Sequence, residues 1–300
     1  MAAPVPNREI IREYLRHAKR FPHIWCPGCG NGIVLGSLLR AIHRKGWAKD
    51  EVVVASGIGC SSRAPVYVDF NTLHTAHGRA LPFATGIKLV NPRLHTVVLM
   101  GDGDALGIGG NHFIHACRRN IDLTAVVVNN FTYGMTGGQQ SPATPQGARA
   151  TTALSGTIEQ PFDIAHLAAA AGATFVARTT TYHVRELEQL LERAFTHKGF
   201  SVVEVIAACP TCYGRRNRSG DAVAMMKWQK DVAVPVEKAR LLQPEELAGR
   251  IVTGVIAERE APEYVEQYRN LCRAAADEAE EAEADLSGGA AAEQAGNEPQ

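Results

Sequence analysis

Five short apolar runs recur along the chain, and segments with the apolar spacing of helices lie between them. The runs are rich in Val and Ala with few polar residues inside them, which is typical of strands buried on both faces of a sheet. They span residues 52–55, 96–100, 124–128, 174–177 and 201–206, and the helical patterns span 33–43, 107–118, 163–171 and 184–195. This alternation predicts an α/β fold with a doubly wound, mostly parallel sheet.

Both ends of the chain and one internal stretch depart from this alternation. Residues 8–19 have the spacing of an amphipathic helix. The stretch 130–160 is rich in Thr, Gly, Gln, Ser and Pro, and because long loops inside compact domains are usually functional, we expect it to cover a ligand. We expect four parts: an N-terminal helical arm (1–23), an α/β domain (24–220), a C-terminal helical extension (221–273) and an acidic disordered tail (274–300).

Composition is that of a globular protein without a membrane span. The 300 residues are 45% hydrophobic, 21% charged and 6% aromatic, and the apolar runs are far shorter than the roughly 18 residues of a transmembrane helix. The N-terminus lacks the apolar stretch of a secretory signal, which predicts a cytoplasmic protein. Eight acidic and no basic residues follow Arg273, so the remainder has 31 basic and 23 acidic residues, a formal charge of +8. This basic body favours anionic ligands or an acidic partner.

Cysteine is the first sign of chemistry. Four of the seven cysteines form two C-x-x-C pairs, Cys26 with Cys29 and Cys209 with Cys212. In a reducing compartment such pairs favour metal or redox chemistry over disulfides. Zinc and a [4Fe-4S] cluster each take four thiolates, so either the two pairs bind zinc together or Cys60 and one later cysteine complete a set with the first pair. The other two lie within helical patterns and are expected to be structural or surface thiols: Cys117 and Cys272.

An acidic, Gly-rich turn follows the second apolar run, and a pair of asparagines follows the third. The turn is Gly101-Asp102-Gly103-Asp104 and the pair is Asn129-Asn130. Because the carboxyl ends of parallel strands meet at one edge of a sheet, we expect Asp102 and Asn130 to converge on one ligand. Their oxygen atoms suit Mg²⁺, and the glycines let the backbone approach a phosphate. The pattern predicts a site for magnesium and a diphosphate.

The same turn and pair resemble the signature of thiamine diphosphate enzymes, in which GDG and NN motifs lie one helix apart. Further strings resemble the β subunit of a 2-oxoacid:ferredoxin oxidoreductase, most closely the 2-oxoglutarate type. They occur at residues 25–30 (WCPGCG), 57–63 (GIGCSSR), 77–79 (HGR) and 133–139 (YGMTGGQ). The resemblance covers roughly residues 20–270. It implies that the α/β domain has the thiamine diphosphate-binding fold of the diphosphate-binding type.

The resemblance also implies roles for individual residues. Magnesium ligands are implied at Asp102, Asn130 and Thr132, the last through its main-chain carbonyl. Contacts with the thiamine or its diphosphate are implied for Ile58, Gly59, Cys60, Ser61, His77, Gly103, Asp104, Gly134 and Met135. Ligands of a [4Fe-4S] cluster near the thiamine are implied at Cys26, Cys29, Cys60 and Cys209, with Cys212 as the alternate fourth ligand. Catalytic roles toward the substrate are expected for His77 and Arg63.

The implied reaction is the oxidative decarboxylation of a 2-oxoacid, most specifically 2-oxoglutarate, to acyl-CoA and CO2, with electrons passing through the cluster to ferredoxin. Since thiamine enzymes need a second domain around the aminopyrimidine ring, we expect an α subunit that also contributes to coenzyme A binding, in an α2β2 complex. The run 213–218 matches no nucleic-acid-binding module. Three alternatives remain open: a pyruvate or broad-range oxidoreductase, a non-redox thiamine decarboxylase, and a zinc-stabilised subunit without activity.

Overall fold

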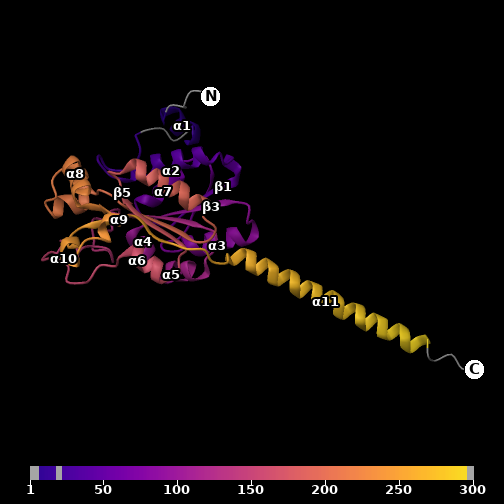
Figure 1. Ribbon diagram of the computed structural model, residues 1–300. Coiled ribbons are helices and arrows are strands. Elements are labelled where there is room, and N and C mark those ends of the chain that lie inside the picture. Colours follow the sequence, from indigo (N-terminus) through magenta and orange to yellow (C-terminus); the bar gives the residue numbers. More distant parts are fainter. Residues whose placement is uncertain (1–6, 18–21, 296–300) are drawn as a thin grey trace, which may run out of the picture.

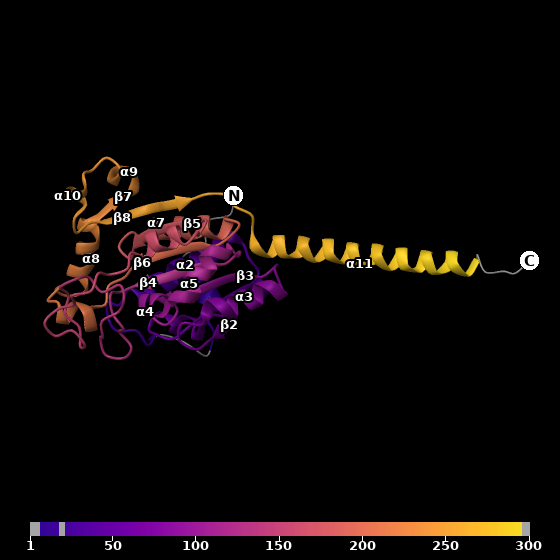
Figure 2. The same ribbon diagram turned by 90° about the horizontal axis from the view of Figure 1, so that it is seen from below.

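The computed structural model describes residues 7–17 and 22–295, which contain an eight-stranded sheet of order β2-β1-β3-β4-β6-β5-β8-β7 (Figures 1 and 2). The strands are β1 (Val52–Ser56), β2 (Asn71–His74), β3 (His95–Gly101), β4 (Thr124–Asn129), β5 (Phe175–Thr180), β6 (Ser201–Ile206), β7 (Ala233–Pro235) and β8 (Ile251–Glu258). Every pairing in it is parallel except that of β5 with β8. The predicted mostly parallel sheet is confirmed.

Helices cover both faces of this sheet (Figure 1). On one face lie α1 (Asn7–Tyr14), α2 (Asn31–Lys45) and α7 (Val184–Thr196), and on the other lie α3 (Ala80–Val90), α5 (Gly110–Arg119) and α6 (Ile164–Ala170). Alternate strand residues enter the two apolar cores: Val97 and Leu99 pack in the first, Val98 and Met100 in the second. Burial on both sides is why these strands appear as uninterrupted apolar runs.

Four neighbouring strands, β1, β3, β4 and β6, end at the same edge of the sheet. The segments that follow them are short: the turn from Gly57 into a 3₁₀ helix (Ser61–Val66), the helix α4 (Asp102–Leu106), the turn at Asn130, and a π-helical turn (Pro210–Gly214). A further 3₁₀ turn (Lys49–Glu51) precedes β1. Motifs that are 150 residues apart along the chain therefore meet at one edge, as the parallel topology requires.

The segment after residue 220 differs from the helical extension that the sequence predicts. It contains three helices, α8 (Ala222–Val232), α9 (Val236–Ala239) and α10 (Pro244–Leu247), but also β7 and β8. The eight-residue strand β8 pairs antiparallel with β5 and extends the sheet. The β-branched residues of β8 fit a strand. The strand is only partly buried, however, and Gly254 interrupts the continuous apolar run that marks the central strands.

The C-terminal segment also differs from the expected disordered tail. Residues Tyr264–Ala295 form one helix, α11, which leads away from the sheet in both views (Figures 1 and 2). Its first turn is attached to the domain, where Val265 is buried in the second core. Ala and Glu, which dominate the segment, are strong helix formers. The expected arm and tail extend over residues 1–6, 18–21 and 296–300, which lie outside the described residues.

None of the helices within residues 7–17 and 22–295 has the length and apolarity that crossing a bilayer requires.

Candidate active site

A pocket of about 150 Å³ opens at the edge where β1, β3 and β4 end. Its lining consists of Ile58, Gly59, Cys60, Ser61, His77, Gly101, Asp102, Gly103, Asp104, Asn130, Thr132, Tyr133, Gly134, Met135 and Thr136. Every residue expected to hold magnesium, diphosphate or thiamine is among them. The structure thus brings these residues together, while their individual roles stay predictions.

Asp102 is one of two buried carboxylates that line this pocket. It begins α4 directly after β3 and is 3% exposed. The hydroxyl of Ser141 donates a 2.5 Å hydrogen bond to its Oδ2, and burial raises the pKa of Asp102 to about 7. None of the ion pairs in the described part of the chain includes Asp102. A buried carboxylate without a compensating charge is unfavourable, and a bound divalent cation supplies that charge.

The turn after β4 holds Asn130 and Thr132 around a residue in an uncommon backbone conformation. Phe131 has a φ of 64°, in the left-handed region that bulky residues rarely adopt. The Thr132 N–H donates to Oδ1 of Asn130 at 3.3 Å, and the Thr132 hydroxyl donates to the carbonyl of Gln139 at 2.9 Å. The Phe131 ring packs on Tyr213 with centroids 5.4 Å apart. Strained residues of this kind cluster at ligand sites.

A buried charged network ties together the strands on which this turn rests. Nδ2 of Asn129 donates to Oε1 of Glu204 at 2.9 Å, and Nε of Arg178 donates to Oε2 at 2.7 Å. Arg178 also pairs with Asp163, and it is only 7% exposed, while Glu204 is 2% exposed. The network links β4, β6 and β5 one residue before Asn130. A single charged residue inside an apolar run is the signal by which Glu204 stands out in the sequence.

Asp104 joins two turns of the pocket to each other. Its Oδ1 lies 2.6 Å from Nδ1 of His77 and accepts from the N–H of Gly78 at 2.7 Å and from that of Ile58 at 3.3 Å. Asp104 is 2% exposed, and within the described residues its Oδ2 has no hydrogen-bond partner. Because a carboxylate only accepts, it places the proton on Nδ1 of His77 and leaves Nε2 for a ligand. The resemblance implies a place beside the diphosphate for Asp104, and the structure adds this contact with His77.

Two residues of the loop 130–160 contribute although no role is expected for them from the sequence. Ser141 is the hydrogen-bond donor to Asp102. The Tyr133 ring lies so close to Gly103 that a Cβ there would be 2.1 Å from Cε1 of the ring. The polar composition of the loop predicts that it covers a ligand, and the structure confirms only that the loop forms part of the pocket lining.

Five cysteines interact beside this pocket. Burial, together with the nearby Cys29, Cys209, Cys26 and Cys212, raises the pKa of Cys60 to about 12. Burial likewise raises the pKa of Cys29, with Cys209 and Cys26 adding to the effect. The four cysteines expected to hold a cluster therefore lie near one another, together with the alternate. The remaining two lie elsewhere, in the second core and on the exposed face of α11: Cys117 and Cys272.

Cys209 and Cys212 both lie near Cys60, and the choice between them as the fourth ligand stays a prediction. A Cβ at Gly134 would lie 3.5 Å from Sγ of Cys60 and 3.8 Å from Sγ of Cys209. Cys29 interacts electrostatically with Cys209 and Cys26, whereas Cys212 interacts with Cys60, Cys209 and Cys26. The Cys212 thiol donates instead to the carbonyl of Gly134 at 3.5 Å.

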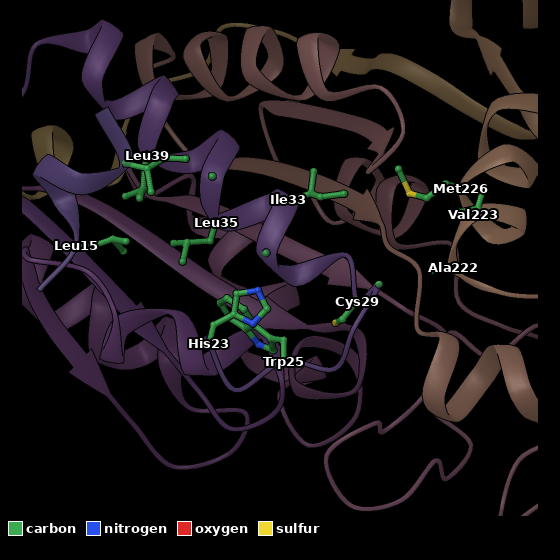
Figure 3. A pocket seen from close by; sticks show the side chains of 14 residues that line it. Leu15, His23, Trp25, Cys29, Ile33, Leu35, Leu39, Ala222, Val223 and Met226 are labelled. Atoms are coloured by element: carbon green, nitrogen blue, oxygen red, sulfur yellow. The ribbon is translucent and has the colours of Figure 1, made fainter. Parts of the chain in front are cut away.

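The turn that carries Cys26 and Cys29 directly precedes α2 and meets the start of α8 at Ala222. Gly28 has a φ of 76°, and a Cβ there would lie 2.3 Å from Cβ of Ala222, so only glycine fits. A mostly apolar cavity of about 460 Å³ lies against this turn, and Figure 3 shows Cys29 between Ile33 and the side chains of α8. Cys29 thus has apolar surroundings on one side and thiols on the other.

Two expectations lack geometric support. Within residues 7–17 and 22–295, no group of three or more His, Cys, Asp or Glu side chains is arranged to hold a metal ion. The donors have suitable chemistry, but they do not form a closed coordination shell. Arg63 belongs to the 3₁₀ helix after β1 and is not one of the residues that line the pocket, so its contact with substrate stays a prediction.

Comparison with known proteins agrees with this site. Residues 57–205 match the family model described as thiamine pyrophosphate enzyme, C-terminal TPP binding domain. The chain is 50% identical over 259 residues to 2-oxoglutarate synthase subunit KorB of Methanocaldococcus jannaschii, covering 86% of this chain and 96% of that one. The subunit of the same name in Archaeoglobus fulgidus is 62% identical over 199 residues, which cover 66% and 74% of the two chains.

A solved structure is similar over nearly the whole chain. It is the 2-oxoglutarate:ferredoxin oxidoreductase from Magnetococcus marinus with 2-oxoglutarate, coenzyme A and succinyl-CoA bound. The TM-score is 0.79 at 31% sequence identity, over 89% of this chain and 90% of that one. Together with the pocket at the strand ends, these similarities show that the chain belongs to the 2-oxoacid:ferredoxin oxidoreductase β-subunit family of thiamine pyrophosphate enzymes.

Proposed function

We propose that this β subunit acts with an α subunit to convert 2-oxoglutarate and coenzyme A into succinyl-CoA and CO2, and that it passes two electrons to ferredoxin. The proposal is supported by the names of the relatives, which are 2-oxoglutarate synthase subunits, and by the ligands in the similar solved structure. The single observation that carries it is the meeting of an acidic turn, an asparagine turn and a group of thiols at one sheet edge.

Asp102, Asn130 and the main-chain carbonyl of Thr132 would hold Mg²⁺ on the diphosphate of thiamine. They fit this role because the Asp102 carboxylate is buried without a cation partner in the described residues, and because all three line one pocket. Thiamine diphosphate, when bound, supplies a nucleophilic carbon and an electron sink for decarboxylation. Ser141 keeps Asp102 oriented toward the pocket by its hydrogen bond.

His77 would contact the diphosphate or the substrate through Nε2. Its Nδ1 is occupied by Asp104, so the ring orientation and the position of the proton are fixed before a ligand binds. Nε2 accepts a hydrogen bond in the neutral ring, and it donates one to an anionic oxygen only when the ring carries both protons. Arg63 would recognise a substrate carboxylate.

Cys26, Cys29, Cys60 and Cys209 would bind a [4Fe-4S] cluster, with Cys212 as the alternate ligand. Four interacting thiols match the ligand set of such a cluster. The cluster, when bound, supplies one-electron transfer. Since ligation requires thiolates, binding of the cluster must release the proton of the Cys60 thiol.

An α subunit would complete the site. Residues 24–220 form the proposed cofactor-binding domain of this chain, flanked by an arm (1–23), an extension (221–273) and a tail (274–300). The partner would supply the aminopyrimidine side of the thiamine pocket and part of the coenzyme A site, in an α2β2 complex. The pocket of about 150 Å³ is small for a cofactor with a substrate, which is consistent with walls contributed by another chain.

Release of labelled CO2 tests the assignment. The β chain alone should give no turnover with 2-oxoglutarate, and addition of the α subunit, coenzyme A and ferredoxin should restore it. The matched comparison is pyruvate in the same assay. Faster turnover of pyruvate would contradict the substrate, and turnover by the isolated chain would contradict the need for an α subunit.

A further inference from the structure

A cavity rich in arginine lies beside the cysteines, outside the pocket described above. Its volume is about 450 Å³, and its walls include Arg149, Arg215, Arg216 and Arg218 as well as Cys212. We call it the arginine cavity. Arg149, Arg215 and Arg218 are exposed, and Arg216 is half-buried. It is therefore an open, strongly basic surface on a chain whose body is itself basic.

The arrangement of this cavity is fixed by its own hydrogen bonds. Asn217 accepts from the N–H of Arg149 at 2.7 Å, and its Nδ2 donates to the carbonyls of Arg149 at 3.1 Å and of Tyr213 at 3.0 Å. This side chain joins the loop 130–160 to the segment after β6. The arginines of the two segments are thus brought together by a specific cross-link.

The charges of these arginines have no acidic partner among the residues that the structure describes. The ion pairs found in residues 7–17 and 22–295 include none of the four arginines of the cavity. Like charges gathered in this way repel one another, and an anionic partner relieves that repulsion. The basic surface is therefore complementary to an acidic one.

The cavity also borders the thiol group. Cys212 lines it directly, and Cys212 interacts with Cys60, Cys209 and Cys26. Gly137 lines it as well, from the same loop whose residues 133–136 line the thiamine pocket. A protein that docks on the arginines would therefore approach the thiols on the side of Cys212.

We propose that the arginine cavity is the docking surface for the acidic, electron-accepting iron-sulfur protein. This inference rests on the proposed function. Oxidation of one 2-oxoacid releases two electrons, and two acceptor molecules each take one in separate encounters. Brief encounters of redox partners use small interfaces and depend on charge steering for their rate. An open basic surface suits this partner better than a small ligand, which binds in an enclosed and mostly apolar pocket.

The test compares two triple variants in the reconstituted αβ complex. In one, Arg215, Arg216 and Arg218 are each changed to Gln. In the matched control, Arg93, Arg118 and Arg119 are changed to Gln, because these exposed arginines lie on other elements and take part in none of the ion pairs of the described residues. The measurements are the KM for ferredoxin, the KM for coenzyme A, the rate with methyl viologen as acceptor, and the calorimetric Kd of ferredoxin at low and high salt.

The cavity variant should raise the KM and Kd for ferredoxin by about tenfold or more at low salt and should flatten their salt dependence. The methyl viologen rate, the KM for coenzyme A and all properties of the control should be unchanged. An increase confined to the KM for coenzyme A would overturn the proposal and assign the arginines to a nucleotide. Unchanged ferredoxin binding would also overturn it. Absence of viologen reduction by the wild-type complex would instead contradict the proposed function itself.

Discussion

Asp102 shows how one residue can indicate a ligand. Its carboxylate is buried, held by one hydroxyl, and has its pKa raised to about 7 by burial. A buried carboxylate of this kind is neutralised either by a proton or by a bound cation. Asp102 directly follows β3 and lines the same pocket as Asn130. A bound cation therefore agrees with the position of Asp102 as well as with its chemistry.

Substitution of Asp102 tests that reading. Asp102→Asn should weaken magnesium-dependent binding of thiamine diphosphate by more than about 100-fold, since even the outer partners of metal ligands contribute 10- to 100-fold. Calorimetry with and without Mg²⁺ measures the change, and thermal unfolding checks that the fold persists. The control is Asp69→Asn, at an exposed carboxylate paired with Lys49. Equal affinity of the Asp102 variant and wild type would show that Asp102 is not a metal ligand.

Asp104 is expected to act through His77. Asp104→Asn and His77→Ala should each lower kcat of the αβ complex by about 10- to 100-fold, because each removes an oriented imidazole. The double variant should be no slower than His77→Ala alone. Additive losses would mean that Asp104 serves the site independently of its hydrogen bond to His77.

The cysteines allow a comparison within one motif. Cys209→Ser should remove most of the iron from anaerobically purified protein, whereas Cys212→Ser should retain it, because Sγ of Cys209 lies with that of Cys60 at Gly134. Cys26→Ser, Cys29→Ser and Cys60→Ser should behave like Cys209→Ser. Cys272→Ser, at an exposed position on α11, is the control. If only Cys212→Ser lost iron, the fourth ligand would be Cys212 and not Cys209.

At the scale of elements, the strand ends organise the site. The network of Asn129, Glu204 and Arg178 crosses three adjacent strands just before the asparagine turn, so the position of that turn depends on a buried ion pair. Removing one charge of such a pair strongly destabilises the fold, because the other charge stays buried without a partner.

Removal of one charge from this network should therefore destabilise the protein. Glu204→Gln should lower the free energy of unfolding by about 3 kcal/mol, the lower end of the range for breaking a buried pair. The control, Glu258→Gln, removes the partner of Arg193 in a pair whose side chains are about half exposed, and it should cost less than about 1 kcal/mol. Urea denaturation measures both. If both variants lost the same free energy of unfolding, burial of the Arg178–Glu204 pair would not add to its contribution to stability.

The elements also show what the sequence could predict. Continuous apolar runs predict the central strands correctly, because strands that are buried on both faces are apolar at every position. The strand β8 differs from the expected helix because it is only partly buried and has no continuous apolar run. The helix α11 extends over residues 274–295, where low apolar content predicts a disordered tail although the residues are helix formers. Motif residues converged as expected, whereas Ser141 and the Asp104 contact depend on tertiary packing that no local pattern contains.

At the scale of the whole molecule, the site is an open edge rather than a closed chamber. The thiamine pocket, the thiols and the arginine cavity follow one another along the ends of the parallel strands and their loops. This order matches a path from substrate to thiamine, then to a cluster, then to an external acceptor. The thiamine diphosphate and the cluster proposed for this one chain would therefore exchange electrons during turnover.

The most direct test is the visible absorption of the reconstituted αβ complex when substrate is added without ferredoxin, under anaerobic conditions. The account predicts an iron-sulfur band that 2-oxoglutarate, coenzyme A and thiamine diphosphate together bleach, because electrons from the substrate reduce the cluster. The Asp102→Asn complex should retain the band and fail to bleach it. A complex without the band, or one whose band substrate leaves unchanged although CO2 is released, would contradict the account.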